Sequence, residues 1–315
     1  MDDLEVRELR YFVAVAEELN FSRAAERLGI SQPPLSRAIS QLERRLGVQL
    51  FERDTRGVAV TAAGQTMLTE ARTALEVMSR VARRTRRAGW AVPTLVTTAK
   101  PGIASGLLGR IVEVYAALPG SPRVEIVVSG YRQQADMVRD GRADAALLSS
   151  PCDERGLDSE PLTTEPRVAA LPAAHRLARR STLRCSDLHG ERMPRWSGAT
   201  PEECVYWSGR DRTDGPGRGV GAHQPEVTVP GPVVNDPTEL LEVVSLGQAV
   251  ALIPASLAEA NLRTDIAYRP VDDASPYTVA VAWTRGARSP VLNSFVRSAI
   301  DVTTSEQGTA APHVS

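Results

Sequence analysis

Residues 29–47 read GISQPPLSRAISQLERRLG, and this stretch decides how the N-terminal part of the chain folds. Its apolar residues have the 4-3-4 spacing that puts one apolar stripe on an α-helix, and they are Leu35, Ile39, Leu42 and Leu46. The two prolines suit the first turn of a helix, where a missing N–H group has no partner to lose. Ser31, just before them, is predicted as the N-cap. The stretch therefore predicts a helix with a fixed start, whose other face is polar and carries Gln32, Ser36, Arg37, Ser40 and Arg44.

The residues before this helix predict two more helices and a tight turn. The pattern from Val6 to Leu19 is that of an amphipathic helix, and a shorter helix runs from Ser22, its predicted N-cap, to Leu28. Gly29 is expected to end the shorter helix in the left-handed conformation. A short helix, a glycine turn and a second capped helix together make a helix-turn-helix.

The residues after the quoted stretch predict a β-hairpin and then a long helix. The segment VQLFERDTRGVAVT (48–61) places apolar residues on both sides of a turn at 54–57, which is the pattern of a two-stranded wing with Arg53 and Arg56 at its tip. Thr61 is predicted to cap a helix that runs to about Arg87. This helix carries a heptad seam, for which a second copy of the chain is the simplest partner, and the dimerisation candidates are Leu68, Ala71, Leu75, Met78 and Ala82.

From residue 93 the pattern changes to strands alternating with helices, which indicates an α/β fold with a largely parallel sheet. A second α/β stretch begins near residue 167, and the last strands and a helix at 290–301 are expected to return to the first half. The segment 197–232 is rich in Gly, Pro and Arg, so no helix is expected beyond about Tyr206. The expected divisions are a winged helix-turn-helix (1–61), a linker helix (62–89), a two-lobed domain (90–302, with lobe I at about 93–165 and 268–302 and lobe II at about 166–267) and a disordered tail (303–315).

The composition is that of an ordinary soluble protein of two or three domains, with 315 residues, 42% of them hydrophobic and 24% charged. No apolar run approaches the roughly 18 residues needed to span a bilayer, and the acidic start MDDLEVRELR is unlike a signal peptide. The cysteines at 152, 185 and 204 fit neither a disulfide framework nor a zinc site, so we expect reduced thiols in a cytoplasmic protein without a metal. Residues 1–90 carry 15 arginines against 12 acidic residues although the net charge of the chain is −1, so the basic surplus lies at the N-terminal end.

A capped helix behind a tight turn, followed by an arginine-tipped wing, is an arrangement that enters the major groove of DNA. Gln32, Ser36 and Arg37 lie at the start of the helix, from which recognition helices reach base edges. Arg53 and Arg56 would reach phosphates or the flanking minor groove. The alternative is an ordinary surface helix, since any amphipathic helix has a polar face. The turn, the cap, the wing and the basic surplus together favour DNA binding.

The run FSRAAERLGISQPPLSRAISQLERRLGVQLFERDTRGVAVTAAG resembles the winged helix of LysR-type transcriptional regulators, and the likeness is continuous from about Leu4 to Ala88. The segments MVRDGRADAALL, LPAAHRLA and LLEVVSLGQAVALIPASL resemble, more weakly, the effector domain of that family. The resemblance implies a homodimer or homotetramer on double-stranded operator DNA with dyad symmetry, and a periplasmic-binding-protein-like domain whose two α/β lobes hold a small-molecule effector. RNA polymerase is a further candidate partner of such a regulator, whereas no cofactor and no membrane are expected. With the polar face, the resemblance gives these DNA-binding candidates: Gln32, Pro33, Ser36, Arg37, Ser40, Arg53 and Arg56.

In open α/β sheets ligands bind beyond the carboxyl ends of the strands, and these ends supply the effector-binding candidates. The helix that starts near Ile103 would point its N–H groups at this place, which favours an anion such as a carboxylate. Lys100, the only lysine of the chain, is expected to pair with such an acidic effector, and the alternative is a solvated loop lysine. Trp196, Tyr206 and Trp207 could line an aromatic pocket, although such residues more often serve packing. The effector-binding candidates are Thr98, Lys100, Gly102, Ser129, Ser149, Trp196 and Asn235.

Two other classes of protein fit the sequence less well. An enzyme would need a nucleophile, a base and an orienting group, yet the sequence has no GxSxG, Walker or HExxH motif and its four histidines are scattered, so no catalytic residue is assigned. The glycine-rich GPGRGVG lacks the flanking strand and helix of a dinucleotide site. An architectural DNA-binding protein without a ligand would not need about 200 further residues of α/β structure.

Overall fold

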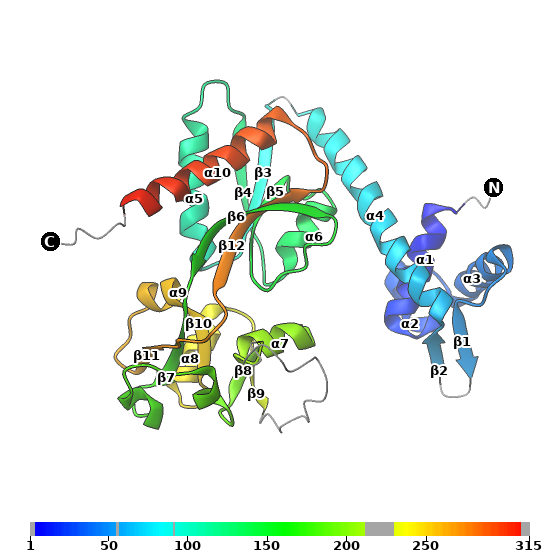
Figure 1. Cartoon of the computed structure of the whole chain (residues 1–315). Helices are drawn as coiled ribbons and strands as arrows, with labels where there is room; N and C mark the ends of the chain where they lie inside the picture. Colours follow the sequence, from blue (N-terminus) through cyan, green and yellow to red (C-terminus); the bar gives the residue numbers. More distant parts are fainter. Residues whose placement is uncertain (1–3, 55–56, 91, 212–229, 310–315) are drawn as a thin grey trace, which may run out of the picture. The chain divides into compact units, whose positions relative to one another are not determined.

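The structure is a computed structural model that describes residues 4–54, 57–90, 92–211 and 230–309 (Figure 1). Its contacts divide the chain into two units, residues 1–89 with 139–142 and the remainder of the chain. Within the described residues, the first unit is built from α1 (Val6–Glu18), α2 (Phe21–Leu28), α3 (Gln32–Leu46), β1 (Phe51–Asp54), β2 (Gly57–Val60) and α4 (Ala62–Ala88).

The predicted helix-turn-helix is formed by α2 and α3. In the predicted apolar stripe of α3, Leu35, Ile39 and Leu42 are fully buried and Leu46, at the end of the helix, is half-buried. The core beside it is aromatic, because the ring centroid of Phe51 lies 5.3 Å from that of Phe12 and 6.0 Å from that of Phe21. Full burial of one such side chain stabilises the fold by about 1.5–3 kcal/mol, so this packing holds α1 and α2 to the wing.

The ends of these helices follow the prediction at the turn and differ at the caps. Gly29 ends α2 with a φ of +69°, the left-handed conformation that favours glycine. The N-cap of α2 is Asn20 rather than the predicted Ser22, because the Asn20 side chain accepts the N–H of Ser22 at 2.9 Å. Ser31 occupies the N-cap position of α3 as predicted, but its hydroxyl makes no capping hydrogen bond.

The predicted wing is the antiparallel pair β1–β2, and it is held to the start of α4. Thr61 caps α4 as predicted, since its Oγ1 accepts the N–H of Gly64 at 3.0 Å. The helix passes so close to the wing that a Cβ on Gly64 would lie 2.2 Å from the carbonyl oxygen of Leu50. Glycine is therefore required at this position by the approach of the two backbones.

Helix α4 ends at Ala88, close to the predicted end at Arg87. Its first half belongs to the core of the first unit, where Leu68 and Ala71 are 7% and 2% exposed. The prediction that these two residues face a second chain is therefore wrong, because α1 packs against this half of α4 and covers them. The exposed large apolar side chains of the helix lie further along, at Val77, Met78 and Val81.

The second unit has two lobes, as predicted. Lobe I consists of β3 (Thr94–Ala99), α5 (Ile103–Ala116), β4 (Arg123–Val128), α6 (Gln133–Arg139), β5 (Ala145–Ser149), β6 (Leu157–Glu165), β12 (Tyr277–Thr284) and α10 (Pro290–Thr309). Its sheet has the order β4-β3-β5-β12-β6, in which β3 runs parallel to β4 and β5 while β12 runs antiparallel to β5 and β6.

Lobe II is built on a second sheet. Its elements are β7 (Arg167–Pro172), two 3₁₀ turns (Arg176–Arg179 and Cys185–Leu188), β8 (Met193–Trp196), α7 (Pro201–Trp207), β9 (Pro230–Val234), α8 (Pro237–Ser245), β10 (Ala251–Pro254), α9 (Ala255–Ala260) and β11 (Ile266–Pro270). Strands β10, β7 and β11 form an antiparallel sheet, and β8 and β9 form a parallel pair.

The strands after residue 93, for which a largely parallel sheet is expected, form parallel pairs in β3–β4 and β3–β5, whereas the main sheet of lobe II is antiparallel. The chain enters this lobe from β6 into β7 and leaves it from β11 into β12, so the incoming and outgoing strands run in opposite directions. Because β11 pairs with β7, the return to lobe I lies after Pro270 and not at the predicted residue 268. Helix α7 ends at Trp207, close to the predicted limit at Tyr206, and residues 212–229 of the irregular segment lie outside the described residues.

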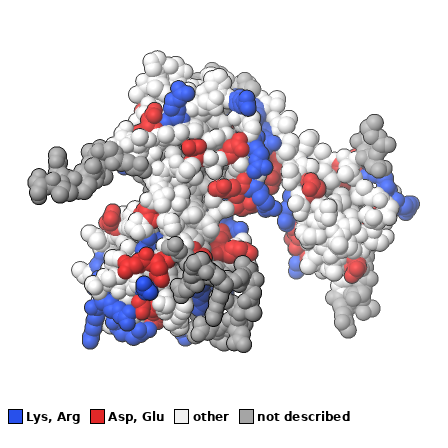
Figure 2. All heavy atoms as spheres, viewed as in Figure 1, with Lys and Arg blue, Asp and Glu red and all other residues white. Residues whose placement is uncertain are grey.

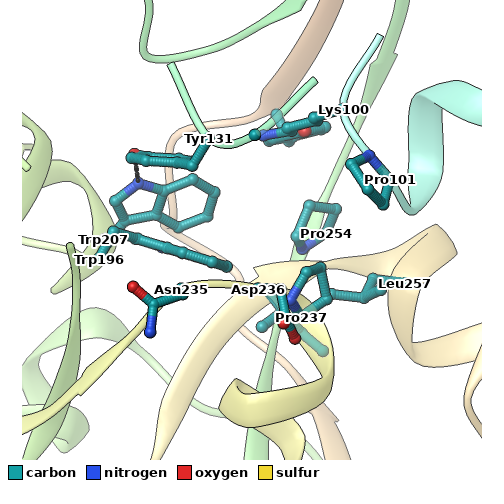
Figure 3. A pocket seen from close by; sticks show the side chains of 13 residues that line it. Lys100, Pro101, Tyr131, Trp196, Trp207, Asn235, Asp236, Pro237, Pro254 and Leu257 are labelled. Atoms are coloured by element: carbon teal, nitrogen blue, oxygen red, sulfur yellow. Dashed lines mark hydrogen bonds between the residues drawn. The ribbon is translucent and has the colours of Figure 1, made fainter. Parts of the chain in front are cut away.

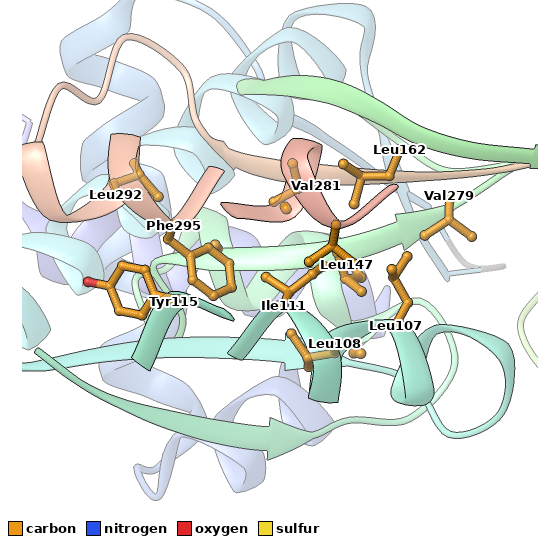
Figure 4. Packing of buried hydrophobic residues seen from close by; sticks show 14 of the residues in the cluster. Leu107, Leu108, Ile111, Tyr115, Leu147, Leu162, Val279, Val281, Leu292 and Phe295 are labelled. Atoms are coloured by element: carbon orange, nitrogen blue, oxygen red, sulfur yellow. The ribbon is translucent and has the colours of Figure 1, made fainter. Parts of the chain in front are cut away.

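The core of lobe I lies between its sheet and the helices α5 and α10 (Figure 4). The rings of Tyr115 and Phe295 meet edge to face, with centroids 5.5 Å apart. Helix α10 continues to Thr309, and Val302 and Thr303 are still buried, so the prediction of a disordered tail is wrong for residues 303–309. Residues 310–315 lie outside the described residues. No helix in the described ranges is long and apolar enough to cross a membrane.

Candidate functional site

The face of α3 that points away from the core carries the polar side chains predicted to read DNA. Those that the structure describes are exposed or half-buried, and they are Gln32, Pro33, Ser36, Arg37 and Ser40. The Arg37 side chain makes no hydrogen bond or ion pair with another described residue of the chain. The only acidic residue of α3, Glu43, is buried, so no carboxylate competes with a phosphate on the exposed face of this helix.

Glu43 instead fastens α3 to the wing. Its Oε1 accepts the backbone N–H of Leu50 at 2.9 Å and that of Phe51 at 3.1 Å. Hydrogen bonds to a charged group are worth about 1.5–3 kcal/mol, so α3 and β1 are held as one body. Arg53 lies in β1, but its side chain and the whole of Arg56 lie outside what the structure describes, and their DNA contacts stay predictions.

The second half of α4 is basic and partly apolar. Figure 2 shows basic side chains gathered along this helix, and its arginines beyond the first half are Arg80, Arg83, Arg84, Arg86 and Arg87. Of the dimerisation candidates here, Met78 is 48% exposed, Ala82 is exposed, and Leu75 is half-buried against the core of the first unit. Met78 and Ala82 therefore remain candidates for contact with a second chain.

The second unit contains a cavity of about 100 Å³ between its two lobes (Figure 3). It lies at the sheet edge where β3 and β4 end and where the antiparallel strand β12 begins. Lobe I contributes Lys100, Pro101, Gly130, Tyr131 and Tyr277, and lobe II contributes Trp196, Trp207, Asn235, Asp236, Pro237, Ile253, Pro254 and Leu257.

One wall of the cavity is aromatic. The ring of Tyr131 is stacked on Trp196, and the centroid of Trp207 lies 6.0 Å from that of Trp196 and 6.2 Å from that of Tyr277. The indole Nε1 of Trp207 donates to the Tyr131 hydroxyl at 3.3 Å. Desolvation raises the pKa of the Tyr131 and Tyr277 hydroxyls, so both side chains are neutral at neutral pH.

Lys100 is the cation of the cavity, and it is half-buried rather than a solvated loop lysine. Its Nζ lies 5.5 Å from the ring centroid of Tyr131 and 5.7 Å from that of Tyr277, within the range of cation–π attraction. It makes no hydrogen bond or ion pair with another described residue. Desolvation lowers the pKa of Lys100 to about 8, and the nearby Cys152 and Glu203 partly oppose this shift.

Neither of these neighbours serves as the counter-ion of Lys100. Desolvation raises the pKa of the Cys152 thiol to about 12, so it is neutral at neutral pH. The Glu203 carboxylate lies 3.2 Å from Nε of Arg132 and also accepts the N–H of Thr200 at 2.7 Å. Among the described residues, the Lys100 ammonium thus faces the cavity without a carboxylate paired to it.

The opposite wall is formed by lobe II. The Asp236 carboxylate lies at the start of α8, where it accepts the N–H of Thr238 at 2.7 Å and that of Glu239 at 3.0 Å. The side-chain amide of Asn235 donates to Glu239 at 2.9 Å. The α8 N-terminus is therefore occupied by the protein's own carboxylate, and the rest of this wall is carbon, from Pro237, Ile253, Pro254 and Leu257.

Three of the seven predicted effector residues line this cavity, namely Lys100, Trp196 and Asn235. Thr98 and Ser129 are buried and bound to each other, with their hydroxyl oxygens 2.7 Å apart, and they do not line this cavity, so their role as effector contacts stays a prediction. They lie just inside the sheet edge, where the Thr98 hydroxyl also donates to the carbonyl of Val127 and the Ser129 hydroxyl to that of Ala99. Gly102 is the N-cap of α5, and neither it nor Ser149 lines the cavity.

Most of the other residues that line the cavity were not among the predicted effector-binding residues. Tyr131 directly follows the strand end at 129–130, so the strand-end rule extended by one residue would have found it. Tyr277 begins an antiparallel strand, to which a rule for parallel strands does not apply. Trp207 lines the cavity, whereas Tyr206 does not, since its hydroxyl donates to the carbonyl of Pro276 at 2.9 Å.

The segments that cross between the lobes are tied together by Arg167, whose side chain is fully buried. Its guanidinium donates to the carbonyls of Ser275 and Tyr206, reaches Asp211 at 3.4 Å, and lies 3.8 Å from the ring centroid of Tyr206. Arg167 begins β7 and Ser275 precedes β12, so one side chain joins both crossings. Among the described residues no group of His, Cys, Asp and Glu side chains could hold a metal ion.

Comparison with known proteins covers nearly the whole chain. Residues 6–65 match the bacterial regulatory helix-turn-helix protein model of the lysR family, and residues 93–303 match the LysR substrate binding domain model. The chain is 31% identical over 298 residues to the Hca operon transcriptional activator HcaR of Escherichia coli, which covers 93% of this chain and 96% of HcaR. It is also 31% identical over 303 residues to the HTH-type transcriptional regulator IlvR of Caulobacter vibrioides, with 93% of this chain and 97% of IlvR covered.

Solved structures agree with the sequence matches. Full-length BenM is 26% identical, with a TM-score of 0.53 and coverage of 98% of this chain and 100% of that one. CbnR, a LysR family transcriptional regulator, has the same fold at 24% identity, with a TM-score of 0.55 and coverage of 95% and 99%. A helix-turn-helix followed by a two-lobed binding domain is thus found by sequence and by structure, and this chain belongs to the LysR family of bacterial DNA-binding transcription regulators, which are not enzymes.

Proposed function

We propose that this regulator binds a dyad-symmetric operator through the exposed face of α3 and is switched by a small anionic effector in the cavity between its lobes. It works as a homodimer or homotetramer in the cytoplasm, with RNA polymerase as a further partner. The observation that carries the effector half of the proposal is the Lys100 ammonium, which faces an otherwise largely apolar cavity without a counter-ion among the described residues.

The DNA half of the proposal is supported by the surface of α3. Its exposed face has polar side chains and no carboxylate, and the Arg37 guanidinium has no protein partner among the described residues. Arginine is the side chain that most often reads guanine, through two parallel hydrogen bonds to O6 and N7. The bonds from Glu43 to the wing hold this face in a defined orientation.

The switch is supported by the position of the cavity. Its walls come from both lobes, so a ligand that touches both walls binds one degree of lobe closure better than another. A ligand shifts a conformational equilibrium only by the difference in its affinity for the two states. By linkage, an effector that changes the affinity for DNA must itself bind more tightly or more weakly when DNA is bound.

Self-association is supported by the exposed apolar side chains of α4, which are Val77, Met78 and Val81. Apolar side chains that recur along one side of a long helix are commonly covered by another helix. Two copies of α3 in one dimer would contact two half-sites, which is the reason for a dyad in the operator.

Footprinting of the purified full chain on the DNA that flanks its own gene tests this function. With a panel of small carboxylates, a protected dyad that shortens or shifts with one compound is the expected result. A Lys100→Met variant should protect the same DNA without responding to the compound. Protection that no compound alters, in either protein, would instead favour a ligand-independent DNA-binding protein, and absence of protection would contradict the role of α3.

A further inference from the structure

We propose that the cavity binds a monoanion built on one planar unsaturated ring, with its anionic group at the Lys100 ammonium and its ring against Tyr131 and Trp207 (Figure 3). This inference rests on the proposed function, because it names the chemical class of effector that the same cavity takes. The walls, the volume and the charge of the cavity each contribute one part of it.

The walls of the cavity select an unsaturated ring. Trp207 is tilted by 57° to Trp196, on which Tyr131 is stacked, so Tyr131 and Trp207 offer a planar ring two aromatic surfaces at a steep angle to each other. In Figure 3 Tyr131, Trp196 and Trp207 lie on one side of the space and Pro101, Pro254 and Leu257 on the other. A flat ring would therefore contact aromatic side chains on one side and aliphatic side chains on the other. Few polar atoms of the cavity wall would lose hydrogen bonds to water.

The volume of the cavity limits the ligand to one ring. The space is about 100 Å³. An engineered apolar cavity of about 150 Å³ in another protein binds benzene, so a single six-membered ring is near the upper size that fits here. Fused ring systems would require the lobes to separate further.

The charges of the cavity select a single anionic group. Among the described residues that line the cavity, Lys100 is the only cationic side chain and Asp236 the only acidic one. The Asp236 carboxylate is held in place by its bonds to the N-terminus of α8. A second anionic group would lie either beside this carboxylate or against apolar side chains, and both positions are unfavourable for a charge. Tyr131 and Tyr277 stay neutral because desolvation raises the pKa of both hydroxyls.

Binding of four probes to the full-length chain tests this inference, by calorimetry and by the fluorescence of the cavity tryptophans. The probes are benzoate, its saturated analogue cyclohexanecarboxylate, its neutral analogue benzamide and the dianion terephthalate. Benzoate should bind most tightly. Cyclohexanecarboxylate should bind about three- to tenfold more weakly because it lacks aromatic contacts, and benzamide about tenfold to a hundredfold more weakly because it lacks the charge. Terephthalate should bind more weakly than benzoate.

Two variants separate the charge from the fold. Lys100→Met keeps a side chain of similar length without the charge, and it should weaken benzoate about tenfold to a hundredfold while leaving benzamide unchanged. Arg288→Met removes an exposed cation beyond the far end of β12 and should leave both affinities unchanged. Thermal melts of both variants should match the wild type, which shows that a lost affinity is not lost folding.

The outcomes distinguish this inference from the proposed function. Equal affinities for benzoate and cyclohexanecarboxylate, equal affinities for benzoate and benzamide, tighter binding of terephthalate, or no benzoate binding at millimolar concentration would each overturn the ring monoanion. If another small carboxylate nevertheless shifts the footprint in a Lys100-dependent way, the proposed function stands. If no compound alters DNA protection, the proposed function fails as well.

Discussion

The ring of Tyr131 is stacked on the indole of Trp196, with centroids 4.9 Å apart and planes inclined by only 15°. Tyr131 follows β4 in lobe I and Trp196 ends β8 in lobe II, so this contact joins the two lobes at the cavity itself. A ligand bound in this cavity would lie next to this contact between the lobes. Under the proposed function, this stack is the contact through which a bound effector would change lobe closure.

Replacement of Tyr131 tests the strength of this contact. An aromatic pair contributes about 0.5–1.5 kcal/mol beyond its buried area, so Tyr131→Ala should lower the free energy of unfolding by no less than this. The same variant should weaken benzoate binding. Urea unfolding followed by circular dichroism measures the first effect. Tyr131→Phe keeps the stack and loses only the bond from Trp207, so it should stay close to the wild type. An alanine variant as stable as the phenylalanine variant would mean that the stack does not hold the lobes.

The pH dependence of effector binding follows from Lys100. Its pKa is about 8 in the unliganded protein, lowered from 10.5 by desolvation, so the ammonium is the majority form only below about pH 8. Benzoate affinity should be constant in mildly acidic and neutral buffer and should fall, by up to about tenfold per pH unit, as the pH rises above about 8. In the complex the bound anion raises the pKa of Lys100. The affinity should therefore stop falling once the pH exceeds this higher pKa.

Three neutral groups around Lys100, the Cys152 thiol and the Tyr131 and Tyr277 hydroxyls, do not titrate in this range. Cys152 titrates only near pH 12, and Tyr131 and Tyr277 titrate above their ordinary pKa. Calorimetric titrations from about pH 6 to about pH 10 measure the profile. The Lys100→Met variant should give a flat profile at its lower affinity, and a decline of equal size in that variant would assign the titration to another group.

Substitution of Arg37 tests base recognition. Arg37→Ala should reduce discrimination at one operator position by about 1–3 kcal/mol, because the bidentate contact with guanine is lost. Binding to operator variants with each base changed in turn measures this loss. Arg10→Ala, which removes an exposed arginine from α1, should leave discrimination unchanged. A uniform loss of affinity over all operator variants would instead make Arg37 a phosphate contact.

Substitution of Met78 tests self-association through α4. Met78→Glu places a charge among exposed apolar side chains and should shift the sedimentation coefficient from that of an oligomer to that of a monomer. Its melting temperature as a folded domain should change little, because Met78 is 48% exposed. Arg83→Glu places the same charge five residues on, about 140° around the helix, and should leave the oligomer intact. Equal dissociation by both variants, or by neither, would contradict this surface as the interface.

Substitution of Arg167 tests the junction between the lobes. Arg167→Ala leaves the carbonyls of Ser275 and Tyr206 without their donors and should cost about 3–5 kcal/mol of stability, the usual effect of removing one partner from a buried charged contact. Chemical unfolding of the second unit in the full chain measures this cost. Arg167→Lys should recover little of it, because an ammonium lacks the planar fork that reaches three acceptors. Full recovery with lysine would show that only the charge matters.

The first unit was largely predictable because its signals are local. The spacing of Leu35, Ile39 and Leu42, the glycine at position 29 and the cap at Thr61 each act within a few residues, and the structure agrees with them. The failures there concern partners distant in sequence. A heptad spacing cannot distinguish a second chain from α1, and α1 is what covers Leu68 and Ala71.

The cavity was predictable only in part because it depends on tertiary geometry. Lys100, Trp196 and Asn235 lie at strand ends, and the rule for parallel strands locates them. The same rule predicts Thr98 and Ser129, whose hydroxyls form a hydrogen bond with each other. Pro254 and Leu257 enter the cavity through packing of lobe II, and no local pattern in the sequence marks them as lining residues.

The central claim is that an anion on Lys100 controls DNA binding, and the affinity for the footprinted operator with and without saturating carboxylate tests it most directly. With the carboxylate that binds tightest, the wild-type affinity for DNA should change by about fivefold or more, the usual size of an allosteric coupling. The Lys100→Met variant should bind the same operator with an affinity that the carboxylate does not change. An equal response of the two proteins, or no response in the wild type, would contradict the claim.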